Sequence, residues 1–84
     1  MNKYYINVNK DSEEYMWIYR GIKKQGNNIL VEIEPLFHND LYNINDLREI
    51  PEKTYNQILD CNFNGFDDEE FELKELALKN IGII

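Results

Sequence analysis

The sequence predicts an α+β fold, in which a small antiparallel β-sheet of three or four strands is followed by two C-terminal helices packed on one face. Three observations support this fold class. Apolar residues in the first half recur at every second position, which is the period of a half-buried strand. In the last third they recur at helical spacing between start and stop signals. The 84 residues, 43% hydrophobic and 13% aromatic, suit one compact domain spanning 1–84.

The first half begins with a strand at residues 4–9, where apolar side chains alternate with their neighbours. A central hairpin follows at about residues 15–34. Its tip is Gly26-Asn27, which suits a two-residue primed turn because Gly adopts positive φ freely and Asn tolerates it. This hairpin anchors the predicted sheet.

Regular pairing outward from that turn places Ile22 opposite Val31, and both side chains are expected to face the core. Pro35 is expected to end the third strand, because proline has no N–H to donate to a neighbouring strand. Beyond it, residues 41–44 are expected to form a short fourth strand and residues 45–48 a helical turn. The rest of the segment 36–50 gives no clear signal.

The first helix is predicted to begin at Pro51, since the first helical position needs no N–H donor. Tyr55, Ile58 and Leu59 then share one helical face, which is the spacing of a buried stripe. Residues 62–65 contain Asn and Gly and should break the helix.

The second helix is predicted to start at the N-cap Asp67, with Phe66 and Phe71 forming a hydrophobic staple around it. Gly82 is expected to stop the helix, with Asn80 as the earlier alternative. The buried stripe of this helix is expected to be Leu73, Leu76, Ala77 and Ile81.

The net charge of −7 is unevenly distributed. Residues 1–31 carry a net +2 and residues 32–84 a net −9. Direct nucleic-acid binding needs clustered Lys and Arg, and the chain has only a modest cluster at Arg20, Lys23 and Lys24. We therefore expect no direct nucleic-acid binding, and a protein partner with a basic surface instead.

Residues 60–71 match the first half of a calcium-binding EF-hand loop and fail in its second half. Phe71 stands where the closing bidentate Glu belongs. One interpretation is a degenerate calcium site, and the other is a joint between two helices in which Gly65 adopts positive φ. The calcium ligands in the first interpretation would be Asp60, Asn62, Asn64 and Asp68.

The densest acidic run, residues 67–72, suggests a docking face that imitates the phosphates of a nucleic acid. The alternative is that these acids only stabilise the N-terminus of a helix and keep the protein in solution. The acidic residues predicted to contact a partner are Asp67, Asp68, Glu69 and Glu72. Glu32 and Glu34, at the end of the predicted hairpin, are expected to contribute as well.

A second candidate surface is aromatic. Tyr15, Trp17 and Tyr19 would lie on one face of the second strand, and Trp and Tyr are favoured anchors of protein interfaces. The other face would carry Met16, Ile18 and Ile22. Either one face is exposed for a partner, or both are covered by the rest of the domain.

Catalysis and cofactor binding are not predicted. His38 is the only histidine and Cys61 the only cysteine, so no nucleophile–base pair or zinc cluster can be assembled from spacing. The lone cysteine favours a reducing, cytoplasmic location. No apolar run approaches the roughly 20 residues of a membrane span.

The sequence therefore predicts a small acidic cytoplasmic protein-binding module that inhibits a partner by occupying its basic, nucleic-acid-binding surface. In length, acidity and lack of catalytic motifs the chain resembles phage and mobile-element inhibitors of host defence, anti-CRISPR proteins among them, which implies a nuclease or another nucleic-acid-binding protein as partner. The alternatives are a calcium-responsive module using residues 60–71 and a structural subunit that self-associates through the aromatic strand. The oligomeric state stays open.

Overall fold

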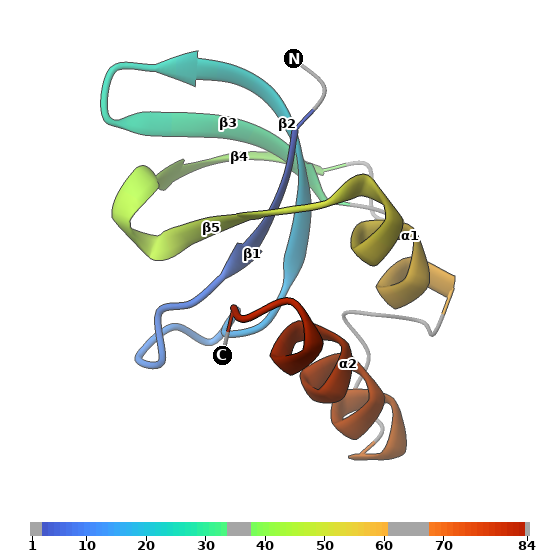
Figure 1. Ribbon diagram of the computed structural model, residues 1–84. Helices are drawn as coiled ribbons and strands as arrows, with labels where there is room; N and C mark the ends of the chain where they lie inside the picture. Colours follow the sequence, from blue (N-terminus) through green and yellow to red (C-terminus); the bar gives the residue numbers. More distant parts are fainter. Residues whose placement is uncertain (1–2, 34–37, 61–67, 84) are drawn as a thin grey trace.

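A computed structural model describes residues 3–33, 38–60 and 68–83, and it shows a curled antiparallel sheet followed by two helices (Figure 1). The α+β class and the helices after the sheet are confirmed, with five strands in place of three or four. No helix within the described ranges is long and apolar enough to cross a membrane.

The strands are β1 (Tyr4–Asn7), β2 (Ile18–Gln25), β3 (Asn28–Ile33), β4 (His38–Asn43) and β5 (Leu47–Ile50). The helices are the 3-10 turn η1 (Ile44–Asp46), α1 (Glu52–Asp60) and α2 (Asp68–Asn80).

The strand order is β4-β3-β2-β1-β5, so the last strand returns to pair antiparallel with the first. The helical turn predicted at 45–48 is found earlier, as η1, while Leu47 and Arg48 belong to β5, which was not predicted. In β5 the buried residues are Leu47 and Ile50, with exposed Arg48 and Glu49 between them. Such a strand shows no alternation, which is why its sequence gives no strand signal.

The central hairpin turns at Gly26-Asn27 as predicted, and Gly26 adopts φ +62°. The register predicted from that turn is wrong by one residue. A β-bulge between Gly21 and Lys23 places Gly21, not Ile22, opposite Val31. Val31 is fully buried, whereas Ile22 is 36% exposed. The bulge adds one residue to β2, and one extra residue moves the following side chain to the other face.

The second strand starts later than predicted, because residues 8–17 form a series of turns before β2. Met16 lies near the end of these turns, where its backbone has φ +71° and its side chain is buried. Its N–H donates to the Asn7 carbonyl at 2.8 Å, and the Asn7 N–H donates to the Trp17 carbonyl at 2.8 Å. This turn interrupts the alternation that the sequence suggested for residues 15–19.

Buried side chains cover both faces of the sheet. The helix-side cluster lies where α1 and α2 pack on the sheet (Figure 1). Its buried members are Ile6, Met16, Ile18, Ile50, Tyr55, Ile58 and Leu78. The second cluster fills the opposite, concave face and joins residues of β1, β2, β3 and β5. Its buried members are Tyr5, Tyr19, Ile29, Val31, Ile33 and Leu47, and Trp17 and Tyr42 pack against it.

The face of α1 is confirmed, since Tyr55 and Ile58 are buried and Leu59 is half-buried. The stripe predicted for α2 is wrong. Leu73 and Leu76 are 56% and 57% exposed, and Ile81 is 39% exposed, while Ala77 is half-buried. The buried residues of α2 are instead Leu78, which belongs to the helix-side cluster, and Lys74, which lines a groove between α2 and α1. The apolar positions of α2 span more than one face, so periodicity alone does not select the buried one.

The helix ends agree with the predicted signals where they are described. Helix α1 begins one residue after Pro51, whose carbonyl accepts the Tyr55 N–H at 3.0 Å. After α2, Gly82 has φ +78° and donates its N–H to Lys79, while Ile83 donates to the Leu78 carbonyl at 3.0 Å. These two bonds form a Schellman motif, which confirms Gly82 as the stop. The predicted Asp67 cap and the staple of Phe66 lie outside the described residues, as does Pro35, and nothing is described of the Phe71 side chain.

Candidate functional site

One end of the concave face opens into a hollow of about 430 Å³ that carries acidic and aromatic side chains. We call it the acidic hollow. It lies between the turns of residues 8–17, the end of β3 and the side of β4 that carries Tyr42. Its lining residues are Glu13, Glu14, Trp17, Ile33, His38, Asp40 and Tyr42.

The turns before β2 are ordered by short-range hydrogen bonds that carry Glu14 to the hollow. The Asn9 N–H donates to Asn7 Oδ1 at 2.9 Å, and the Glu14 N–H donates to Ser12 Oγ at 3.0 Å. The Asn7 side chain is 1% exposed and donates from Nδ2 to the Tyr19 hydroxyl at 3.3 Å. A buried amide of this kind fixes its surroundings because each lost hydrogen bond leaves an unsatisfied polar group.

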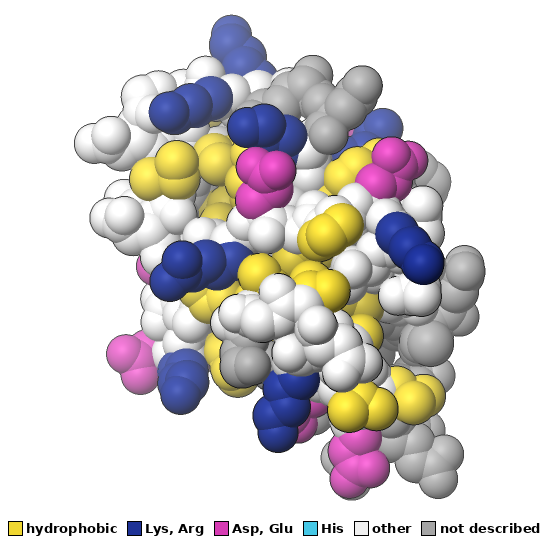
Figure 2. Space-filling view, viewed as in Figure 1, with side chains coloured by type: hydrophobic (Ala, Val, Ile, Leu, Met, Phe, Trp, Pro, Cys, Tyr) yellow, Lys and Arg dark blue, Asp and Glu magenta, His cyan; other side chains and the backbone are white. Residues whose placement is uncertain are grey.

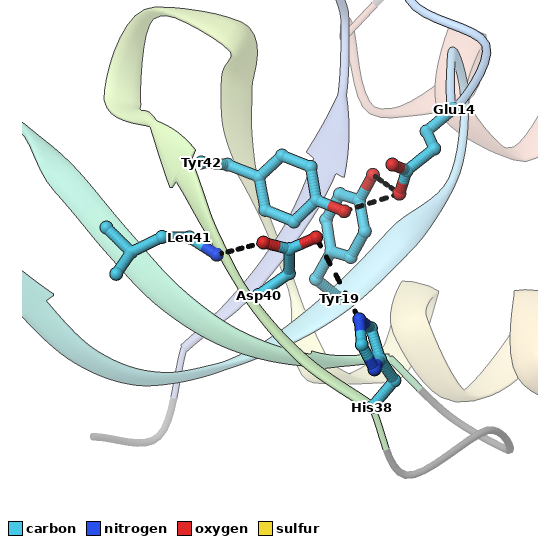
Figure 3. Close-up of polar contacts among 6 residues, drawn as sticks. All are labelled: Glu14, Tyr19, His38, Asp40, Leu41 and Tyr42. Carbon is cyan, nitrogen blue, oxygen red and sulfur yellow. Dashed lines mark hydrogen bonds and ion pairs between the residues drawn. The ribbon is translucent and has the colours of Figure 1, made fainter.

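Glu14 joins the turns to two strands. One of its carboxylate oxygens accepts hydrogen bonds from the hydroxyls of Tyr19 on β2, at 3.1 Å, and of Tyr42 on β4 (Figure 3). The two phenol rings stack with centroids 4.7 Å apart. Burial raises the pKa of Tyr19 above its usual range. The pKa of Tyr42 is raised by burial and then by its hydrogen bond to Glu14. Both phenols therefore stay protonated at neutral pH and serve as donors.

The rim of the hollow carries further charge. Glu13 and Asp40 are exposed. One Asp40 oxygen accepts the Leu41 N–H at 2.8 Å, and the other lies 4.0 Å from Nε2 of His38 (Figure 3). The hollow thus contains three carboxylates and one imidazole beside the half-buried ring of Trp17. A concave, partly desolvated wall strengthens the field of such charges, and aromatic faces attract cations.

The predicted aromatic set does not share one face. Trp17 packs against the concave cluster and lines the hollow, whereas Tyr15 packs against the helix-side cluster. Tyr19 is fully buried beneath Tyr42, so no surface of its side chain is available to a partner. Of the two interpretations of this strand, the one in which both faces are covered fits Tyr19 and Ile18.

The predicted acidic set is likewise dispersed. Glu32 on β3 forms an ion pair with Arg20 of β2, its partner in the register. Glu72 is exposed on α2. Asp68 and Glu69 belong to the first turn of α2, but their side chains are not described, and Asp67 and Glu34 lie outside the described residues.

The calcium prediction is not tested by the structure. Asn62, Asn64 and Cys61 lie outside the described residues, and Asp60 and Asp68 are described only as helix termini. Within the described ranges, no three His, Cys, Asp or Glu side chains gather in a way that would hold a metal ion.

Sequence reasoning missed most of the hollow. Two signals were present. Glu13 and Glu14 directly precede the aromatic run, and His38, Asp40 and Tyr42 recur at every second position, which places them on one side of a strand. Because β4 was predicted only from residue 41, this alternation was not recognised.

Comparison of the chain with protein-family models, with curated proteins and with solved structures finds no match.

Proposed function

We propose that this chain is a non-enzymatic protein-binding module, and that the acidic hollow receives a Lys or Arg side chain from a basic surface of its partner. The observation that carries the proposal is the sharing of one hollow by Trp17, Tyr42 and three carboxylates, those of Glu13, Glu14 and Asp40. Carboxylates at the rim supply charge and hydrogen-bond acceptors, and the aromatic rings supply a face for the cation.

Guanidinium fits this hollow better than ammonium. It is planar, it stacks on aromatic rings and it donates two parallel hydrogen bonds to a carboxylate. Glu14 is held by Tyr19 and Tyr42, so the carboxylate available to a ligand is that of Glu13, together with the Asp40 oxygen that does not accept the Leu41 N–H. We therefore expect an arginine to be preferred over a lysine.

The net charge of −7 supports the same role at longer range. It steers a basic partner toward the module and repels nucleic acid. A module that occupies the basic channel of a nucleic-acid-binding protein would exclude the phosphates that normally bind there. This is the inhibitory role that the resemblance to anti-defence proteins implies.

The proposal is tested by titrating the intact chain with N-acetyl-arginine amide and following the fluorescence of Trp17, the only tryptophan. The matched probe is N-acetyl-citrulline amide, which has nearly the same shape without the charge. We expect saturable binding of the arginine probe, with a dissociation constant on the order of 1 mM. Citrulline should bind at least about tenfold more weakly, since it loses the charge-assisted and cation–π contributions. Equal responses to the two probes would contradict the proposal.

A further inference from the structure

Helices α1 and α2 leave a mainly apolar groove of about 620 Å³ open between them, and no strand residue lines it among the described residues. Ile58 and Thr54 of α1 are buried at its base, and Leu73, Leu76 and Ile81 of α2 stand exposed beside it. Figure 2 shows apolar side chains at the surface over α2, next to acidic ones. An exposed apolar patch bordered by polar residues is typical of a protein interface.

The groove and the ridge beside it belong to the same patch of surface. Leu73, Leu76 and Asn80 follow one another at intervals of three and four residues and form a ridge along α2. A two-fold axis near Leu76 would insert the ridge of one copy into the groove of the other. Two-fold interfaces require this self-complementarity, and helices pack with ridges in grooves.

The charges along α2 specify the direction of such a pairing. Its first half is acidic and ends at exposed Glu72, while its last turn carries exposed Lys79. An antiparallel arrangement centred on Leu76 brings Glu72 of one copy near the end of α2 that holds Lys79 in the other. A parallel arrangement would place the acidic halves side by side, which like-charge repulsion disfavours.

From this ridge, groove and charge pattern we propose that the α1–α2 groove is the interface of an antiparallel homodimer, occupied by α2 of a second copy of this chain. The interface is separate from the acidic hollow, which lies on the concave side of the sheet. It is also separate from the aromatic strand on which the sequence alone suggested self-association.

Rising salt should change the affinity of the dimer and the affinity of the hollow for a cation in opposite directions. Two copies carry −7 each, so their overall repulsion is screened as ionic strength rises, while the apolar contact persists. Salt also screens the Glu72–Lys79 attraction, but the repulsion between seven net charges on each copy is larger, so we expect the dimer to tighten at high salt. Binding of a basic probe in the acidic hollow should weaken under the same conditions.

Sedimentation equilibrium of the intact chain, from micromolar to millimolar concentration and at low and high salt, tests the proposal. We expect a monomer–dimer equilibrium that Leu76→Glu weakens at least about tenfold. Leu76 is 57% exposed, so this variant should fold, and its circular dichroism melt checks that it does. The matched control is Leu41→Glu on β4, where the leucine is 42% exposed and the dimer should be unaffected.

A charge exchange tests the direction of packing. Glu72→Lys and Lys79→Glu should each weaken the dimer, and the double variant should regain much of the lost affinity. Loss in both single variants without recovery in the double variant would contradict the antiparallel arrangement. A monomer at every concentration, or a dimer indifferent to Leu76→Glu, would overturn the proposal, and in the first case the groove would be left for a helix of another protein.

Discussion

At the scale of single residues, Glu14 has the most consequential position in the described structure. Its carboxylate accepts hydrogen bonds from Tyr19 and Tyr42 and so ties the turns of residues 8–17 to two strands. The residue therefore supports the wall of the acidic hollow rather than serving as its free acceptor. Its exposed neighbour Glu13 has no such structural task among the described contacts and is available to a ligand.

Glu14→Gln should lower the free energy of unfolding by about 1 to 3 kcal/mol, because the phenols of buried Tyr19 and half-buried Tyr42 lose a charged acceptor. Chemical denaturation of the variant and the parent measures this difference. Glu13→Gln, one residue away and exposed, is the control and should stay within about 0.5 kcal/mol of the parent. Equal behaviour of the two variants would mean that the Glu14 bridge does not stabilise the fold.

Lys74 should make the free energy of unfolding depend on pH. It is 5% exposed, and burial lowers its pKa from 10.5 to about 7. Between pH 7 and about 10 the unfolded chain therefore binds a proton that the folded chain has released. The free energy of unfolding should rise with pH over this window, by at most about 1.4 kcal/mol per unit. Above pH 10 the raised pKa values of Tyr19 and Tyr42 act in the opposite direction.

Thermal unfolding at successive pH values tests this prediction with two variants. Lys74→Met keeps the apolar stem and should abolish the rise in the free energy of unfolding between pH 7 and 9. Lys79→Met, an exposed lysine of the same helix, should retain the rise. A parent protein whose stability is flat from pH 7 to 9 would show that the folded chain keeps Lys74 charged.

At the scale of elements, the sequence predicted what local rules decide and missed what packing decides. The Gly26-Asn27 turn and the Gly82 stop were predicted because glycine adopts positive φ without steric cost. The bulge at Ile22 and the buried face of α2 depend on how distant elements meet. No periodicity within either segment reports that contact, so their predicted core positions were wrong.

The bulge between Gly21 and Lys23 leads us to expect different effects of an aspartate on β2 and on β3. Val31→Asp should lower the free energy of unfolding by about 3 kcal/mol or more, because it places a charge in the concave cluster. Ile22→Asp should lower the free energy of unfolding by less than about 1 kcal/mol, since the bulge turns this side chain outward and leaves it 36% exposed. Urea denaturation of both variants decides the register. Similar large losses would restore the regular pairing expected from the turn.

At the scale of the whole molecule, the acidic composition predicts a basic partner, whereas the location of the proposed site follows from the topology of the sheet. The order β4-β3-β2-β1-β5 curls the sheet and brings the turns before β2 against β4. Glu13 and Asp40 are 27 positions apart in the chain, and no spacing rule connects them. Of the predicted acidic residues, none lines the hollow among those whose side chains are described, and the hollow joins three carboxylates to the rings of Trp17 and Tyr42.

The most direct test of the central claim is to neutralise the rim of the acidic hollow and repeat the N-acetyl-arginine amide titration at fixed salt. The hollow variant is Glu13→Gln with Asp40→Asn. The matched variant is Glu49→Gln with Glu52→Gln, which removes the same two charges from exposed positions on β5 and α1. The account predicts that the hollow variant binds the probe about tenfold more weakly, while the matched variant binds it nearly as well as the parent. Equal losses in the two variants would show that arginine responds to net charge alone and would contradict a binding site in the hollow.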